Sequence, residues 1–380
     1  MNEAACSNLM DHFATLDDPR RNYGNLRHDF EAVLAIALCG MICGADDWFT
    51  IAEFGKAKQT WLETFLDLPN GIPSHDTFND IFAKLEPQQF QECFIAWASS
   101  LSDLLPKDVV AIDGKALRGS YDKARSKPAI HMVSAWCAAN EICLGQVKTE
   151  AKSNEITAIP KLLKMLNLDG ALVTIDAMGC QKSIVQDIQD RNADYLLGVK
   201  DNQPTLHEAI HERFINAEST DFATDFVSSA VPPDAAPRHG TAVTCRVSQN
   251  LEGFERLTDA WVGLKSLIVI ETEAGLGDQK TRERRLYISS RVENAEYFLA
   301  ATRKHWQIEN KLHWVLDVAY REDGARNRIG HSAENLSTLR RISLNILKND
   351  KTAKLGIKSK RLTAGWDEAY LMRLLSDLKS

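Results

Sequence analysis

The sequence contains no apolar run long enough to cross a lipid bilayer. Its longest apolar segment, Ala32 to Cys43, is well short of the roughly 20 residues that a membrane-spanning helix needs. The first 26 residues also lack the basic-then-apolar order of a secretion signal. We therefore expect a cytoplasmic protein with no membrane partner.

Cysteine patterns typical of metal or disulfide scaffolds are missing as well. The eight cysteines are scattered, with no C-x-x-C pair and no spacing typical of a zinc site. Cys39 and Cys43 lie one helical turn apart in an apolar segment, which predicts buried thiols without a disulfide.

The chain has no internal repeat or low-complexity tract, and its charge is unevenly distributed. It has 380 residues, of which 44% are hydrophobic and 26% charged, a composition typical of two or three globular domains. The net charge is -7, with -10 in residues 1–105 and +7 in residues 301–360. A basic region beside candidate acids suits a polyanionic substrate, although a solvated helix face is the plainer interpretation of any single charge.

Residues 1–105 have a helical pattern and predict an all-α N-terminal domain. Gly44 ends an apolar helix, Ser74 caps another that runs to Leu85, and Pro87 opens a third. Such a bundle is a candidate for DNA binding, dimerisation or packing only. Its acidity favours contact with protein over contact with phosphate.

After Pro106 the pattern predicts an α/β fold. Three strands precede a helix from Ser153 or Asn154, and two further strand–helix units follow. This βββαβαβ order is that of a ribonuclease-H-like fold. We therefore divide the chain into a helical domain (1–105), the first part of a catalytic core (106–217), a β-rich insertion (218–292), the second part of the core (293–349) and a C-terminal tail (350–380).

Two acids are expected at strand ends. Asp113 follows one apolar strand and Asp176 another, each with a glycine within three residues. An aspartate in this place commonly begins a turn by accepting a backbone N–H, so either residue alone has a structural explanation. Both together favour a shared site where strands end.

A third acid, Glu309, is expected on a helix over residues 302–316. A projection at 100° per residue places Glu309 in the middle of the less polar face. A carboxylate there must be paired, protonated or bound to a cation, because an isolated buried charge costs several kcal/mol. Glu322 and Asp323 form a second acidic candidate, with solvated loop charge as the alternative.

Three converging carboxylates would suit hard cations such as Mg²⁺, with Mn²⁺ as a substitute. Mg²⁺ binds oxygen ligands, and two such ions can activate the attacking oxygen and stabilise the leaving oxygen of a phosphodiester. The pairs His305–Trp306 and His313–Trp314 are too far apart along a helix to share one metal, so we expect them to pack in the core or to face substrate.

Several polar residues near strand ends are candidate DNA contacts, although lone lysines are commonly just solvent-facing. Trp261 is a candidate for stacking on an unpaired base, with a hydrophobic contact as the alternative. The candidate DNA contacts are Lys115, Arg118, Lys152, Lys182, Lys200, Asn202, Gln203, Arg303 and Lys311.

Long motifs in the chain resemble the bacterial insertion-sequence DDE transposases, in the branch that includes the H-repeat-associated proteins. The motifs are IDGKALRGSYDK (112–123), KSNEITAIPKLL (152–163), TIDAMGCQK (174–182), DYLLGVKDNQ (194–203) and HWQIENKLHWVLDV (305–318), with GADDWFTIAEFG (44–55) and NGIPSHDTFNDIF (70–82) in the helical region. The resemblance implies a ribonuclease-H-like domain interrupted by a β-rich insertion, and Mg²⁺-dependent cleavage and transfer of double-stranded DNA at transposon ends. It also implies Asp113, Asp176 and Glu309 as the acidic triad, and a homodimer on DNA.

Two features depart from related transposases. Thr302, His305 and Leu316 stand where relatives have Tyr, Arg and Lys around the glutamate. In the insertion, residues 239–243 lack the charged pair that usually follows His-Gly, which argues against DNA contacts there. The leading hypothesis is a transposase. The alternatives are a nuclease of this fold without strand transfer, or a catalytically silent DNA-binding remnant.

Overall fold

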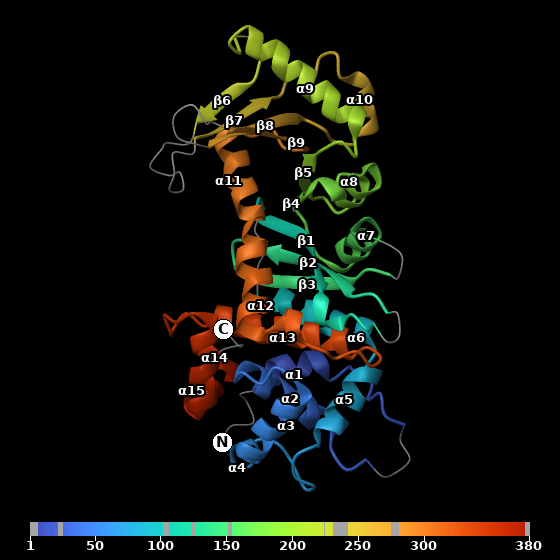
Figure 1. The fold of residues 1–380 in the computed structure, drawn as a ribbon, viewed down its shortest axis with the longest axis vertical. Coiled ribbons are helices and arrows are strands. Elements are labelled where there is room, and N and C mark those ends of the chain that lie inside the picture. The colour runs from blue at the N-terminus through green and yellow to red at the C-terminus, as the bar shows by residue number, and fades with distance from the viewer. Residues whose placement is uncertain are drawn as a thin grey trace.

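A computed structural model describes residues 7–21, 26–101, 106–123, 127–150, 154–223, 225–230, 242–274 and 281–376. Within these residues, nine strands form one mixed sheet in the order β3-β2-β1-β4-β5-β9-β8-β7-β6. The sheet runs along the long axis of the molecule, with the N-terminal helices beneath its β3 end (Figure 1). The predicted α/β class is confirmed.

The first five strands have the predicted order. The elements are β1 (Val109–Leu117), β2 (Ile130–Cys137), β3 (Ile142–Lys148), α7 (Glu155–Met165), β4 (Leu172–Ile175), α8 (Lys182–Gln189), β5 (Asp194–Val199) and α9 (Pro204–Ser219). Strands β1, β2 and β3 pair antiparallel, whereas β4 runs parallel to both β1 and β5. A short 3₁₀ turn, η1 (Arg118–Ser120), follows β1, and η2 (Ala177–Gly179) follows β4.

Strand β1 is longer than predicted, so Asp113 is not at its end. Parallel pairing with β4 stops at Ile112 and Ile175, but antiparallel pairing with β2 continues as far as Leu117 opposite Ile130. The hydrogen bonds to β2 keep the chain extended beyond the acid. Asp113 therefore lies inside a strand, at the point where β4 no longer pairs with it.

Residues 218–292, predicted to be a β-rich insertion, hold four strands within the described residues that continue the same sheet, and the first of them was not predicted. They are β6 (Val227–Ala230), β7 (Ala242–Ser248), β8 (Ser266–Ala274) and β9 (Thr281–Ser289), with α10 (Glu255–Ala260) between β7 and β8. Strand β9 returns beside β5 and pairs with it antiparallel, for example Leu197 with Ile288.

Alternate residues of the strands face two different helical layers. Ala111 and Leu172 belong to one core, and Ile112 and Ile175 to the other, as expected because side chains alternate along a strand. Helices α7, α8 and α9 cover one face, whereas α11 (Ala295–His305) crosses the other (Figure 1).

The helices at the two ends of the chain share one hydrophobic core. The N-terminal helices are α1 (Ser7–Phe13), α2 (Phe30–Ile42), α3 (Trp48–Ala57), α4 (Gln59–Leu62), α5 (His75–Lys84) and α6 (Pro87–Ser100), and the C-terminal ones are α12 (Trp314–Tyr320), α13 (Ser332–Asn349), α14 (Ile357–Trp366) and α15 (Glu368–Ser376). Core residues from Leu9 to Leu375 form a single cluster. Helices α2, α5, α6 and α13 lie where helices were predicted, whereas α14 and α15 lie in residues predicted only as a C-terminal tail. The division into domains stays a prediction.

Two further predictions concern cysteines and membranes. In the described part of the chain no disulfide is found, and Cys39 is buried as predicted, whereas Cys43 is only partly buried. Among these residues no helix is both long and apolar enough to span a bilayer.

Candidate active site

Asp113 projects from β1 towards the face that α11 and α12 cover. Its side chain is 22% exposed, and Oδ2 lies 3.4 Å from Nδ1 of His313. Burial raises the pKa of Asp113 to about 7, opposed by a hydrogen bond from the Gly114 backbone and reinforced by the charges of Glu155, Asp176 and Glu309. Asp113 is thus close enough to three other carboxylates to feel their repulsion.

Asp176 follows the last residue of β4, as predicted. Its Oδ1 accepts a hydrogen bond of 3.0 Å from the Met178 backbone and caps the 3₁₀ turn η2. Burial and the charge of Glu155 raise its pKa, whereas the Gly179 and Met178 backbone N–H groups and Lys200 oppose the rise. Asp176 therefore both begins a turn and lies near other carboxylates.

The prediction that Glu309 lies on a buried face of a regular helix is wrong. Helix α11 ends at His305, and Glu309–His313 form a π-helical turn, η4, before α12 begins. Ile308 and Leu312 are fully buried on the core side, and Glu309 lies just outside it, exposed. An exposed carboxylate needs no internal partner, so the argument from buried charge does not apply. π-helical turns are rare in proteins, and those that occur are frequently found at functional sites.

The donor set fits a divalent cation. Asp113, Asp176 and Glu309 come from β1, the end of β4 and η4, and the repulsion that Asp176 and Glu309 exert on Asp113 is the kind that a bound cation would relieve. All their oxygens are the hard ligands that Mg²⁺ prefers. Over the described ranges, no three His, Cys, Asp or Glu side chains already stand in a metal-binding arrangement.

A cavity of about 250 Å³ adjoins Asp176. Its lining includes Lys200 from the end of β5, Arg285 from β9, and His305 and Trp306 from the end of α11. His305 is buried with its Nδ1 3.0 Å from Oγ1 of Thr174, and burial lowers its pKa to about 4. Trp306 is 39% exposed. Both side chains line the cavity, the histidine from a buried position and the tryptophan from an exposed one.

In the second His–Trp pair, too, the histidine is buried and the tryptophan is exposed. His313 is 9% exposed, whereas Trp314 is 61% exposed. Thr302 and Leu316, which replace polar residues of related transposases, are both buried like His305. These positions serve packing here. Trp261 is also buried, 1% exposed, which favours its hydrophobic role over base stacking.

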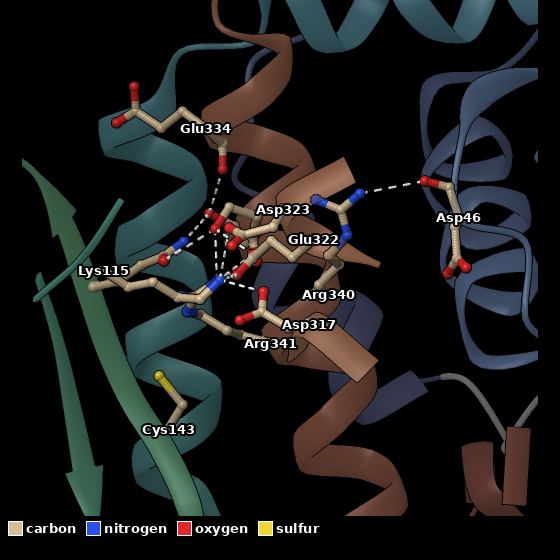
Figure 2. A network of polar contacts seen from close by, with 12 residues as sticks. Asp46, Lys115, Cys143, Asp317, Glu322, Asp323, Glu334, Arg340 and Arg341 are labelled. Atoms are coloured by element: carbon tan, nitrogen blue, oxygen red, sulfur yellow. Dashed lines mark hydrogen bonds and ion pairs between the residues drawn. The ribbon is translucent and has the colours of Figure 1, made fainter. Parts of the chain in front are cut away.

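The burial of Lys115 among acidic side chains argues against its predicted role as a DNA contact. Its side chain is 9% exposed, and its Nζ contacts Asp317 and lies 3.1 Å from Asp323 and 3.5 Å from Glu322. Figure 2 shows Lys115 pointing from the strand into these acids. Three carboxylates of α12 and the turn η5 (Glu322–Gly324) already neutralise it.

The same network extends to α13. Glu322 is completely buried and pairs with Arg341 at 3.0 Å, while Arg340 reaches the Asp46 backbone at 3.3 Å (Figure 2). The expectation of solvated loop charge at Glu322 is therefore wrong. Part of the basic charge of residues 301–360 is internal, because three of its thirteen lysines and arginines, Arg340, Arg341 and Lys360, are buried and neutralise acids or bind backbone carbonyls.

The remaining candidate DNA contacts fall into three groups. Lys182, Lys200 and Arg303 are exposed, and Arg118 is 83% exposed. Asn202 and Gln203 donate hydrogen bonds to the carbonyls of Ala177 and Cys180, so they hold the loop after Asp176. Lys311 pairs with Glu141. Lys152 lies outside the described residues.

Sequence reasoning missed Glu155 as a neighbour of both aspartates. Glu155 occupies the first turn of α7, directly after the N-cap Asn154. The available signal is the motif KSNEITAIPKLL, in which Glu155 directly follows the residue that begins the helix.

Family comparisons place the chain among known proteins. The model of the Transposase DDE domain family matches residues 104–346, and that of the DDE_Tnp_1-associated family matches residues 10–98. The chain belongs to the DDE transposase family. The prediction made from the motifs is confirmed.

Relatives of this DDE transposase family chain include two from Escherichia coli. It is 40% identical to the "H repeat-associated putative transposase YhhI" of strain K12, over 97% of both chains. It is also 40% identical to the "Putative transposase YncI" of strain O157:H7, over 97% of this chain and 94% of that one. Among solved structures, a piggyBac transposase synaptic complex with hairpin DNA aligns with a TM-score of 0.44 and 9% identity, covering 99% of this chain and 77% of that one.

Proposed function

We propose that the protein cleaves DNA at transposon ends and joins the cleaved ends to target DNA, with divalent ions held by Asp113, Asp176 and Glu309. The observation that carries the proposal is that Asp176 and Glu309, which come from separate elements, lie close enough to Asp113 for their charges to raise its pKa. The strand order β3-β2-β1-β4-β5 further supports a ribonuclease-H-like core.

The bound ions would supply activation of the attacking oxygen and stabilisation of the leaving oxygen. The protein's own contribution is to hold the acids in place: β1 fixes Asp113, the capped turn η2 fixes Asp176, and the π-helical turn presents Glu309. Lys182, Lys200 and Arg303 are exposed and free to bind backbone phosphates.

The test is cleavage of DNA bearing the element's terminal repeats in the presence of Mg²⁺. Asp113→Asn, Asp176→Asn and Glu309→Gln should each abolish cleavage while DNA binding persists, because removing a negative charge does not weaken attraction to phosphate. Near-native cleavage by Glu309→Gln would show that another residue is the third acid.

A strand-transfer assay separates the proposed transposase from the alternatives. Joining of cleaved ends to a target plasmid supports the proposal. Cleavage without joining would indicate a plain nuclease, and DNA binding without metal-dependent nicking would indicate a silent remnant. Analytical ultracentrifugation with terminal-repeat DNA tests the expected homodimer.

A further inference from the structure

Glu155 lies at the acidic site although it comes from the opposite face of the sheet. It belongs to the first turn of α7, which Asn154 begins by accepting a hydrogen bond of 3.1 Å from the Ile156 backbone. The Glu155 side chain is 13% exposed and its Oε1 lies 2.7 Å from Nε2 of His131 on β2. The helix start thus directs this carboxylate towards the sheet.

A glycine on β1 makes room for it. Gly114 faces the α7 side, because its neighbour Asp113 faces the other. A Cβ built on Gly114 would overlap Oε1 of Glu155 and Nε2 of His131. Any other residue at position 114 would therefore displace the glutamate, and the backbone of β1 and the carboxylate are in close approach.

Glu155 and Asp113 approach from opposite faces of the sheet, beside the place where β1 and β4 stop pairing. The parallel pairing of β1 with β4 stops at Ile112 and Ile175, one residue before Asp113 and Asp176. Past that pair β1 and β4 no longer pair, and Gly114, the neighbour of Asp113, is the residue that Glu155 approaches. The charge of Glu155 acts on both aspartates, and it is the first among the acids that raise the pKa of each.

The imidazole of His313, which has one nitrogen without a hydrogen bond in the described part of the chain, lies beside Asp113. His313 is nine-tenths buried, its Nδ1 faces Asp113 at 3.4 Å, and its Nε2 has no hydrogen-bond partner within the described residues. The partly buried carboxylates of Asp113, Asp176 and Glu155 are polar groups that burial penalises unless something binds them.

We propose that Glu155 is a fourth acidic ligand for the divalent ion held by Asp113 and Asp176, and that His131 is the positioning residue that orients it. The inference rests on the proposed function, because it assumes that the metal binds there. His131 lies 2.7 Å from one oxygen of Glu155, which leaves the other oxygen available as a ligand. A purely structural Glu155–His131 ion pair is the alternative.

The experiment is Mn²⁺ binding to the full-length protein, measured by isothermal titration calorimetry without DNA. Glu155→Gln should weaken Mn²⁺ affinity by more than the roughly 10- to 100-fold typical of losing an outer-shell partner, because it removes a ligand itself. His131→Gln should weaken it less, because the carboxylate remains.

Glu334→Gln is the matched control. Glu334 also stands in the first turn of a helix, pairs with a cation on a strand (Lys148 on β3), and is 16% exposed. Its replacement should leave Mn²⁺ affinity unchanged. Thermal unfolding with and without Mn²⁺ checks that each variant is folded. The Mn²⁺-induced rise in Tm should shrink for Glu155→Gln, shrink less for His131→Gln, and stay unchanged for Glu334→Gln.

The outcomes separate the two proposals. If Glu155→Gln binds Mn²⁺ like the parent protein while Asp113→Asn does not, the fourth ligand is overturned and the three-acid site stands. If the parent protein itself binds no Mn²⁺ by calorimetry and gains no Tm, both the metal site of the proposed function and this inference fail.

Discussion

Glu322 keeps a negative charge in the protein interior because three cations surround it. Burial raises its pKa, but Arg341, Arg340 and Lys115 together lower it to about 2. Arg341 in turn is fully buried and donates to Glu322 and to Ser337. Because both side chains are buried, water cannot solvate either charge if its partner is removed.

Replacing Glu322 alone should therefore destabilise the fold strongly. Glu322→Gln is expected to cost about 3–5 kcal/mol, the range for breaking one side of a buried ion pair. Urea unfolding at pH 7 measures it. Glu283→Gln is the control, because its pair with Arg285 is 60% exposed on the glutamate side, and exposed pairs contribute about 1 kcal/mol or less. Equal losses in the two variants would contradict the network's role.

The same residue should make stability depend on pH in the acid range. A carboxyl whose pKa falls from 4.5 to about 2 on folding stabilises the folded state above pH 4.5, and that contribution is lost as pH falls from 4.5 towards 2. We expect the free energy of unfolding of the parent protein to fall faster over this interval than that of Glu322→Gln/Arg341→Met. Parallel pH profiles would show that Glu322 is not ionised in the fold.

At the scale of elements, α13 joins the N-terminal helices to the sheet. Almost the whole helix is buried, and Asn335 donates to the carbonyls of Phe82 and Leu85 at the end of α5. Trp48 of α3 donates to Ser332 at the start of α13. A helix near the C-terminus thus forms hydrogen bonds with helices near the N-terminus.

Asn335→Ala should uncouple these elements. It leaves two buried carbonyl oxygens without their donor, at about 1–3 kcal/mol for each unsatisfied group. Asn216→Ala, on the exposed side of α9, should change the free energy of unfolding by no more than about 0.5 kcal/mol. Chemical denaturation of both variants measures the difference. A neutral Asn335→Ala would mean that water replaces the amide.

The elements were largely predictable from local pattern, and the site only in part. Apolar runs and caps located the strands from β1 to β5 and the start of α7 at Asn154, because these signals lie within a few residues. The continuation of β1 to Leu117 depends on pairing with β2, a contact between distant segments. The π turn at Glu309, the burial of Lys115 and the approach of Glu155 to Gly114 depend on packing in the same way.

At the scale of the whole molecule, exposed positive charge gathers at the carboxyl ends of β4 and β5 and on α11. Lys182, Lys200 and Arg303 are exposed there, and each phosphate contact adds about 0.9 to the slope of log affinity against log salt. Alanine at each position should reduce that slope by about 0.9 in fluorescence anisotropy titrations with duplex DNA.

Lys107 provides the control for this measurement. It is also an exposed lysine, 59% exposed, but it precedes β1 at the opposite edge of the sheet. Lys107→Ala should leave the slope unchanged. An equal drop for Lys107→Ala would mean that DNA is attracted by overall charge rather than by this edge.

The position of α13 in the chain has a consequence for synthesis on the ribosome. About 250 residues separate the end of α6 from the end of α13, which at 5–20 residues per second is roughly 12–50 s of translation. During that time apolar side chains of the early helices, such as Phe82 and Trp97, lack the neighbour that completes their core. The nascent chain should therefore be a client of chaperones that bind exposed apolar segments until the last helices emerge.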